Sequence, residues 1–123
     1  MELHQSAEDY LEKIMMIDEK KGSVRSIDIA NELGFSKASV SIAMKKLREN
    51  GFILFDDDNY ITLTPKGRNI AEEVYRKHKL LTKFFVYIGV PEETAAEDAC
   101  KIEHHLSGAS FDKLLEYAEK MGF

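Results

Sequence analysis

The strongest constraint on the fold of this 123-residue chain is a change of hydrophobic period directly after Gly51. Before that point, Val40, Met44 and Leu47 follow one another at i, i+4 and i+7, which is the spacing of one helix face. After it, two β-prone segments, 52–55 and 60–63, flank a polar run and are typical of a hairpin. Since two short helices precede that hairpin, the first part of the chain is predicted to fold as a winged helix-turn-helix.

Helix-start and helix-stop residues place the two short helices. Ser26 is expected to cap the first of them, which ends at Gly34. Ser36 is expected to cap the second, about three residues later, which is the separation found in a helix-turn-helix. A longer helix is expected ahead of both, with Ser6 as its N-cap.

The second half of the chain has a helical pattern again. Thr64 and Pro65 supply the cap and the first residue of a long helix that runs to Gly89. Pro91 opens a further helix, and Ser110 is expected to cap the last one. The apolar stripe predicted for the middle helix consists of Ala95, Ala99, Ile102 and Leu106. The predicted fold class is therefore mainly α, with an N-terminal winged helix-turn-helix domain (1–64) and a C-terminal helical domain (65–123).

The distribution of charge bears on function more than the total does. Seventeen basic residues against 22 acidic ones give a formal net charge of −5, which alone argues weakly against nucleic-acid binding. The second short helix nevertheless has no acidic residue between Ser36 and Arg48, and nearby charges dominate because salt screens distant ones. Cations there would contact phosphates, and hydroxyls would contact bases or phosphates. The predicted DNA-binding residues are Arg25, Ser36, Lys37, Ser39, Ser41, Lys45 and Lys46.

The predicted hairpin turn is poorly suited to binding DNA. Asp56, Asp57 and Asp58 would repel phosphates. The expected contacts of this region with the DNA backbone are therefore Asn59 and Lys66. A lysine-rich helix face can also be a solvated surface with no partner. The order helix, helix, hairpin favours the DNA-binding interpretation over that alternative.

A second group of residues has the chemistry of a metal site. Cys100, Glu103 and His104 stand at i, i+3 and i+4, so on one helix a thiol, a carboxylate and an imidazole would share a face. Each candidate also has an ordinary interpretation, such as a buried cysteine, first-turn acids or a solvated histidine. His4 and His105 are predicted not to be ligands. Six candidates on three helices, enough for one or two ions, are Asp9, Glu12, His78, Cys100, Glu103 and His104.

These segments resemble the diphtheria-toxin-repressor / manganese-transport-regulator family of metal-dependent repressors. The resemblance covers nearly the whole chain and is carried by residues 8–12, the helix-turn-helix, and segments 63–67, 76–78 and 100–107. It implies a homodimer whose winged helices read a palindromic operator in double-stranded DNA, and it assigns metal binding and dimerisation to residues 65–123. The ligand set that it implies is Asp9, Glu12, His78, Cys100, Glu103 and His104.

Within that family the sequence combines two branches. Asp9 and Glu12 match the manganese branch, whereas Cys100 matches the iron branch. Thr82 stands where the iron branch has a carboxylate of its second site. Oxygen ligands suit Mn²⁺ and a thiolate suits Fe²⁺, Co²⁺ or Zn²⁺. The expected cofactor is therefore Mn²⁺ or Fe²⁺, with Co²⁺ and Zn²⁺ able to bind in vitro.

The function expected from the sequence is a metal-activated repressor of metal-homeostasis genes. A cytoplasmic location is expected, because Cys100 has no cysteine partner and no stretch reaches the ~18 apolar residues of a membrane span. Two alternatives stay open. One is a winged-helix regulator that responds to an organic ligand rather than a metal. The other is a small metalloenzyme built on His78 and the Cys100 group, for which so short a helical chain leaves little room for a substrate cleft.

Overall fold

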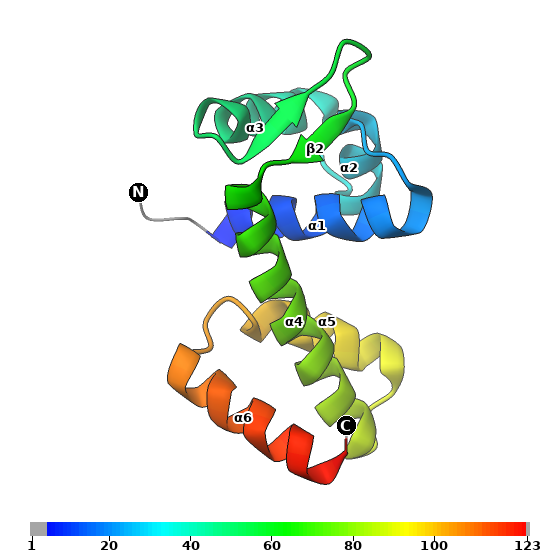
Figure 1. The fold of residues 1–123 in the computed structure, drawn as a ribbon. Helices are drawn as coiled ribbons and strands as arrows, with labels where there is room; N and C mark the ends of the chain where they lie inside the picture. The colour runs from blue at the N-terminus through cyan, green and yellow to red at the C-terminus, as the bar shows by residue number, and fades with distance from the viewer. Residues whose placement is uncertain (1–4, 123) are drawn as a thin grey trace. The chain divides into compact units, whose positions relative to one another are not determined.

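The computed structural model describes residues 5–122, which form helices and one hairpin (Figure 1). The elements are α1 (Gln5–Lys21), α2 (Ser26–Leu33), α3 (Lys37–Glu49), β1 (Ile53–Phe55), β2 (Ile61–Leu63), α4 (Pro65–Tyr87), α5 (Glu92–Ile102) and α6 (Gly108–Met121). The chain divides into two compact units, Met1–Glu72 and Glu73–Phe123. Helix α4 begins in the first unit and ends in the second.

The first unit has the predicted winged helix-turn-helix fold. Helix α2 packs on α1 and α3, while β1 contacts α3 and β2 contacts α1. The strands pair antiparallel, with Ile53 opposite Leu63 and Phe55 opposite Ile61. In Figure 1, α1 lies across the base of this unit, and α3 and the hairpin lie above it. The apolar face of each element is turned inward, because only there does its hydrophobic stripe leave water.

The buried stripe of α3 fixes how that helix is displayed. Val40, Met44 and Leu47 are 0%, 0% and 5% exposed, as their spacing predicts. They share the core of the unit with residues of every other element in it, including Leu11, Ile14, Ile29, Ile53 and Ile61. The opposite face of α3 is consequently directed to solvent.

The second unit is helical, which confirms the predicted mainly α class. Its core consists of Leu80 from α4 with Phe111 and Ala118 from α6, and Phe84, Leu106, Leu114 and Leu115 pack against them. Helix α5 contributes the buried Ala95 and Ala99. Within residues 5–122, no helix combines the length and the apolar character of a membrane span.

The predicted helix starts were right in three cases and wrong in three, and Pro91 is the N-cap of α5 as predicted. Ser36 caps α3 by accepting the Ser39 N–H, and Thr64 precedes α4 as predicted. Ser6 lies inside α1, so it is not its N-cap. The caps of α2 and α6 are Arg25 and Ser107 rather than Ser26 and Ser110.

Two different hydrogen bonds fix the displaced caps: at α2 a side chain bonds back to the cap, whereas at α6 the cap side chain itself accepts a backbone N–H. A residue at the third helical position can return a hydrogen bond to the cap, which moves the boundary ahead of the most obvious serine. For α2, the Asp28 carboxylate accepts the Arg25 N–H at 2.9 Å. For α6, the Ser107 hydroxyl accepts the Ser110 N–H at 3.2 Å.

Helix α5 is shorter than its predicted stripe. It ends at Ile102, which is 40% exposed rather than buried, and Leu106 lies beyond it. Glu103 keeps helical backbone angles (φ −59°, ψ −30°) as the C-cap. His104 follows in a turn that is closed by the His105 N–H donating to the Ile102 carbonyl. The helical face shared by Cys100 and Glu103 therefore stops before His104.

We predict that Gly67→Ala destabilises the protein. A Cβ at Gly67 would collide with the carbonyl oxygen of Phe52, and that oxygen is held in place by the Thr64 N–H at 3.1 Å. Overpacking against backbone should lower the free energy of unfolding by about 1–3 kcal/mol, measured by urea denaturation. Gly108→Ala, where a Cβ meets nothing within 4 Å, is the matched control and should be neutral or slightly stabilising. Equal changes in the free energy of unfolding for the two variants would contradict the close approach of Gly67 to the Phe52 carbonyl.

We also predict an acid-dependent contribution from Asp28. The Lys21 ammonium, at 2.7 Å, and the Arg25 N–H hold the pKa of Asp28 below its usual value. Because the folded pKa lies below the unfolded one, this stabilisation is complete above about pH 4 and is lost as the pH falls through the folded pKa. Asp28→Ala should therefore lower the free energy of unfolding by about 1 kcal/mol at pH 7 and by less at pH 3. Asp57→Ala, in the exposed hairpin turn, should change neither value. A pH-independent effect of Asp28→Ala would refute this account.

Candidate metal centre and nucleic-acid interface

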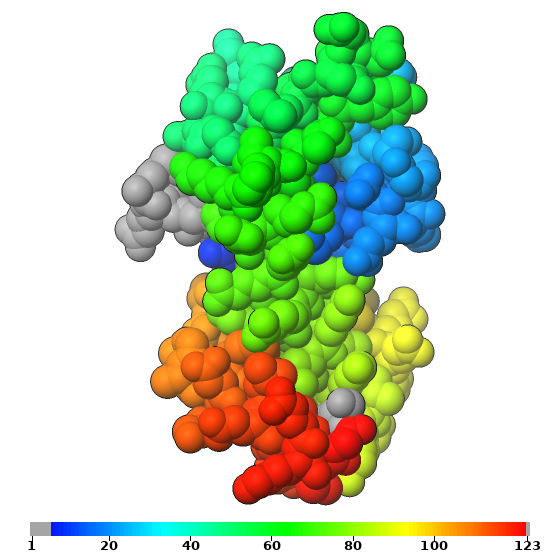
Figure 2. Space-filling view, viewed as in Figure 1, coloured from blue at the N-terminus to red at the C-terminus, as the bar shows by residue number. Residues whose placement is uncertain are grey.

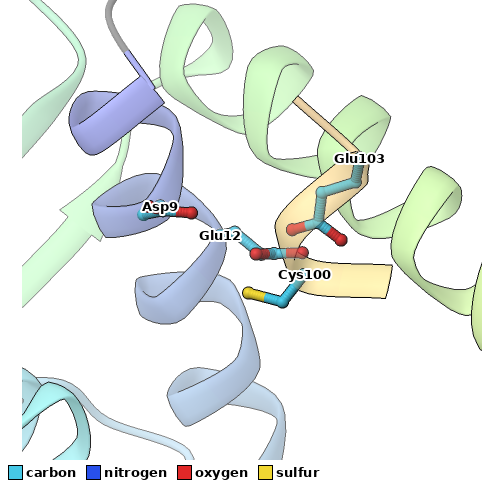
Figure 3. A group of neighbouring side chains, drawn as sticks. All are labelled: Asp9, Glu12, Cys100 and Glu103. Carbon is cyan, nitrogen blue, oxygen red and sulfur yellow. The ribbon is translucent and has the colours of Figure 1, made fainter. Parts of the chain in front are cut away.

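Helix α1 carries the first pair of candidate metal ligands. Asp9 and Glu12 are three residues apart, so their carboxylates lie on the same face of the helix (Figure 3). Glu12 is 3% exposed, and Asp9 is half-buried. Burial raises the pKa of the neighbouring Tyr10, and the Asp9 carboxylate raises it further, so the phenol stays neutral beside the acids. The first unit therefore supplies two oxygen donors on one short segment.

The second unit contains a compact group of three candidate ligands. The side chain of Glu103 is fully buried, and its Oε2 atom lies 2.9 Å from Nδ1 of His78, within hydrogen-bond distance of an imidazole donor. Its other oxygen, Oε1, lies 3.4 Å from Nε2 of His104. The two imidazoles are 15% and 2% exposed. Helix α4 and the turn after α5 thus bring a carboxylate and two imidazoles together.

Cys100 completes the set of candidates on α5. It stands one helical turn before Glu103, so its thiol and that carboxylate extend from neighbouring positions at the end of the helix (Figure 3). The side chain is exposed rather than buried, so the ordinary interpretation of a lone cysteine as a small core residue is wrong here. Asp9, Glu12, Cys100 and Glu103 each offer one ligand atom of a type that metals bind.

The chemistry of these residues fits a divalent transition metal. Among the described residues, Oε1 of the buried Glu103 accepts no hydrogen bond, although a buried carboxylate oxygen normally has a donor or a cation. Imidazole nitrogen, carboxylate oxygen and thiol sulfur are the donor types of Mn²⁺, Fe²⁺, Co²⁺ and Zn²⁺ sites. Thr82 adds nothing to this set, because its hydroxyl donates to the His78 carbonyl at 2.7 Å.

The solvent-facing side of α3 carries the predicted DNA-binding residues. All seven are exposed, and they come from the start of α2 and from α3 with its N-cap. Ser36 caps the helix and also donates its hydroxyl to Ser39 at 2.9 Å, so these two hydroxyls form a fixed pair. No acidic side chain lies between Ser36 and Arg48, which leaves this surface positively charged.

A groove of about 500 Å³ separates α3 from the hairpin, and cations line it. Figure 2 shows α3 and the hairpin as neighbouring lobes at the top of the view. The Arg25 guanidinium lies 4.2 Å from the centre of the Tyr60 ring, and Arg48 lies 5.6 Å from that of Phe55. Lys45 also lines the groove. Since an aromatic face limits where a guanidinium can point, the hairpin orients the two arginines.

The tip of the hairpin is acidic, as its sequence predicted. The Asp56 carboxylate accepts the N–H groups of Asp58 and Tyr60, both at 2.9 Å, which fixes the turn, and Asn59 adopts a positive φ of 66°. Lys66, which the sequence suggested as a phosphate contact, donates to the Asn50 carbonyl at 3.1 Å and lies over the Phe52 ring. That contact holds its ammonium against the protein.

The predicted set leaves out Ile42, a large apolar residue on the α3 surface. This side chain is 60% exposed and lies two residues from both Val40 and Met44, the buried stripe. At 100° per residue it points almost directly away from the core. The spacing of Ile42 from the buried stripe indicates this direction. The predicted DNA-binding set, however, contains only cationic and hydroxyl residues.

Comparison with known proteins identifies the same two functional parts. Residues 2–59 match the iron dependent repressor N-terminal DNA binding domain, and residues 64–123 match the iron dependent repressor metal binding and dimerisation domain. The HTH-type transcriptional regulator MntR of Bacillus pumilus is 39% identical over 109 residues, which are 89% of this chain and 76% of that protein. MntR of Bacillus subtilis is 38% identical over 118 residues, 94% of this chain and 83% of the relative.

Solved structures of the family have the same fold. The manganese regulator SloR is 29% identical, with a TM-score of 0.79 over 92% of this chain. A manganese-dependent transcriptional repressor in complex with manganese is 30% identical, with a TM-score of 0.80 over 95%. The chain spans about half the length of both structures (53%).

These matches decide between the interpretations of the sequence. They confirm the resemblance, and the metalloenzyme alternative is wrong because the family consists of DNA-binding regulators rather than enzymes. They also support a divalent metal as cofactor and DNA and a second copy of the chain as partners. The chain belongs to the iron-dependent repressor family and is a metal-dependent, DNA-binding transcriptional regulator.

Proposed function

We propose that the six candidate ligands hold a divalent metal that activates DNA binding. The observation that supports this best is the buried Glu103 carboxylate between two imidazoles, with Oε1 accepting no hydrogen bond among the described residues. In this proposal Asp9 and Glu12 contribute the oxygen donors of α1, and Cys100 contributes sulfur. We keep the two predicted domains: residues 1–64 bind DNA and add Asp9 and Glu12 to the metal site, and residues 65–123 supply the other four ligands and bind a second copy.

The metal connects the two functions through the elements that carry its ligands. When bound, the cation would offset the negative charge of the carboxylates. It would also link the helices that carry its ligands. Helix α1 packs against α2 and β2, so a constraint on α1 reaches the winged helix-turn-helix. We propose that the constrained dimer presents its two α3 helices about 34 Å apart, one turn of DNA, to a palindromic operator.

The physiological metal in this proposal is Mn²⁺ or Fe²⁺. Carboxylate oxygens are hard donors that Mn²⁺ accepts, whereas the exposed thiol of Cys100 favours Fe²⁺, Co²⁺ and Zn²⁺. The relatives named as manganese regulators favour Mn²⁺ by similarity. Repression of metal-homeostasis genes from the cytoplasm is the role that follows for such a sensor.

We predict that metal removal abolishes tight DNA binding. Protein treated with EDTA should bind a selected duplex about 100-fold more weakly than protein with Mn²⁺ or Fe²⁺, because coupling of this size corresponds to about 2.7 kcal/mol. Glu103→Gln should remove the response, while Glu97→Gln, exposed on α5, should keep it. Fluorescence anisotropy in both conditions measures the difference. Equal affinity with EDTA and with metal would overturn the proposal, and thermal melting of the EDTA-treated variant identifies a mere folding defect.

The role of Cys100 can be tested with Co²⁺. Cys100→Ser should remove the thiolate-to-cobalt charge-transfer absorption and should weaken Co²⁺ binding more than Mn²⁺ binding, because the hydroxyl is a harder ligand than the thiolate. Isothermal titration with both ions gives the ratio. An unchanged cobalt spectrum would exclude Cys100 from the site and leave the other five residues as the proposed ligands.

We predict that Lys45→Ala weakens binding to all DNA sequences alike. In the proposed interface Lys45 contacts a phosphate, so its loss should reduce the slope of log affinity against log salt by about one contact. Lys113→Ala, an exposed lysine on α6, is the control and should leave the slope unchanged. A loss of affinity that depends on DNA sequence, with an unchanged salt slope, would instead indicate that Lys45 contacts a base.

A further inference from the structure

A large apolar side chain occupies the middle of the α3 surface. Ile42 is 60% exposed, and no other large apolar residue described in the first unit is more exposed. It lies about 160° around the helix from both Val40 and Met44, which are fully buried. The side chain therefore contributes nothing to the core, and its exposure to water has no structural reason within this unit.

The surroundings of Ile42 indicate what would cover it. Lys45 and Lys46 follow it by three and four residues, and Ser39 and Ser41 flank it on either side of the helix, all of them exposed. A second copy of this surface would bring like charges together, because α3 has no acidic residue before Glu49. A polyanion is the complementary partner, and the chain's DNA-binding domain contains this helix.

The major groove of DNA offers one apolar group on its base edges, the 5-methyl group of thymine. We propose that Ile42 contacts such a methyl group and thereby selects thymine at one position in each operator half-site. The inference rests on the proposed α3–DNA interface and adds a specificity residue to it. The cations beside Ile42 position the helix on the phosphates, whereas Ile42 distinguishes a base.

Replacing thymine by uracil tests the contact, because deoxyuridine differs from thymidine in that methyl group alone. Binding sites are first selected from a random duplex pool with the wild-type protein and Mn²⁺. Each thymine of the best site is then replaced singly by deoxyuridine. For the wild-type protein, one replacement per half-site should lower affinity about fourfold, the effect of burying one methyl-sized group.

Ile42→Ala supplies the second arm of the experiment. The variant should bind the thymine site more weakly. It should also lose the uracil penalty, the drop in affinity when uracil replaces thymine, at that one position. Because Ile42 is exposed and alanine favours helix, the variant should fold normally. Leu54→Ala, which removes an equally exposed apolar side chain from β1, should keep the penalty and is the matched control.

The outcomes distinguish a failure of the Ile42 inference from a failure of the proposed DNA-binding function. If Ile42→Ala retains the full uracil penalty, the inference is wrong while the DNA interface stands. If the variant instead changes the oligomeric mass and leaves the penalty intact, this face binds protein and the inference is likewise wrong. If no site is selected with Mn²⁺ or with Fe²⁺, the proposed function itself fails.

Discussion

A carboxylate is expensive to bury, and the second unit contains one with no exposed surface. Removing a charged group from water is tolerated only where donors or cations replace the water. For Glu103 the imidazole of His78, on α4, lies within hydrogen-bond distance of Oε2, whereas Oε1 lies 3.4 Å from Nε2 of His104 and accepts no hydrogen bond among the described residues. A continued helix would have set the position of His104 by helical periodicity, whereas the turn places its Nε2 atom 3.4 Å from Glu103.

The first unit depends on a different constraint, the orientation of one helix. The buried stripe of Val40, Met44 and Leu47 fixes the rotation of α3, and the Ser36 cap fixes where it begins. The remaining surface is then set by position in the sequence: cations and hydroxyls around an apolar centre. The hairpin adds Tyr60 and Phe55 as aromatic supports for Arg25 and Arg48. Its contribution is thus to orient cations that belong to the neighbouring helices.

The sequence predicted what depends on hydrophobic period and on helix-breaking residues. The winged helix-turn-helix, the hairpin and the long α4 follow from spacing and from Gly34, Gly51 and Pro65, and all of them are present. Helix caps were less predictable, because a returning hydrogen bond such as that of Asp28 competes with the nearest serine. The exposure of Cys100 and the grouping of His78 with Glu103 are tertiary properties, since 25 residues separate that pair in the chain. The DNA-contacting and metal-binding roles stay predictions that the geometry supports.

The acidic hairpin tip has a consequence for how the protein reaches its target. Asp56, Asp57 and Asp58 stand a short distance along the chain from the cationic α3, so opposite charges occupy neighbouring parts of one small domain. A collision with a polyanion that begins at the hairpin is repelled, whereas one that begins at α3 is attracted. Such a local dipole orients the domain before contact. Productive encounters become a larger share of all collisions, and their rate becomes sensitive to ionic strength.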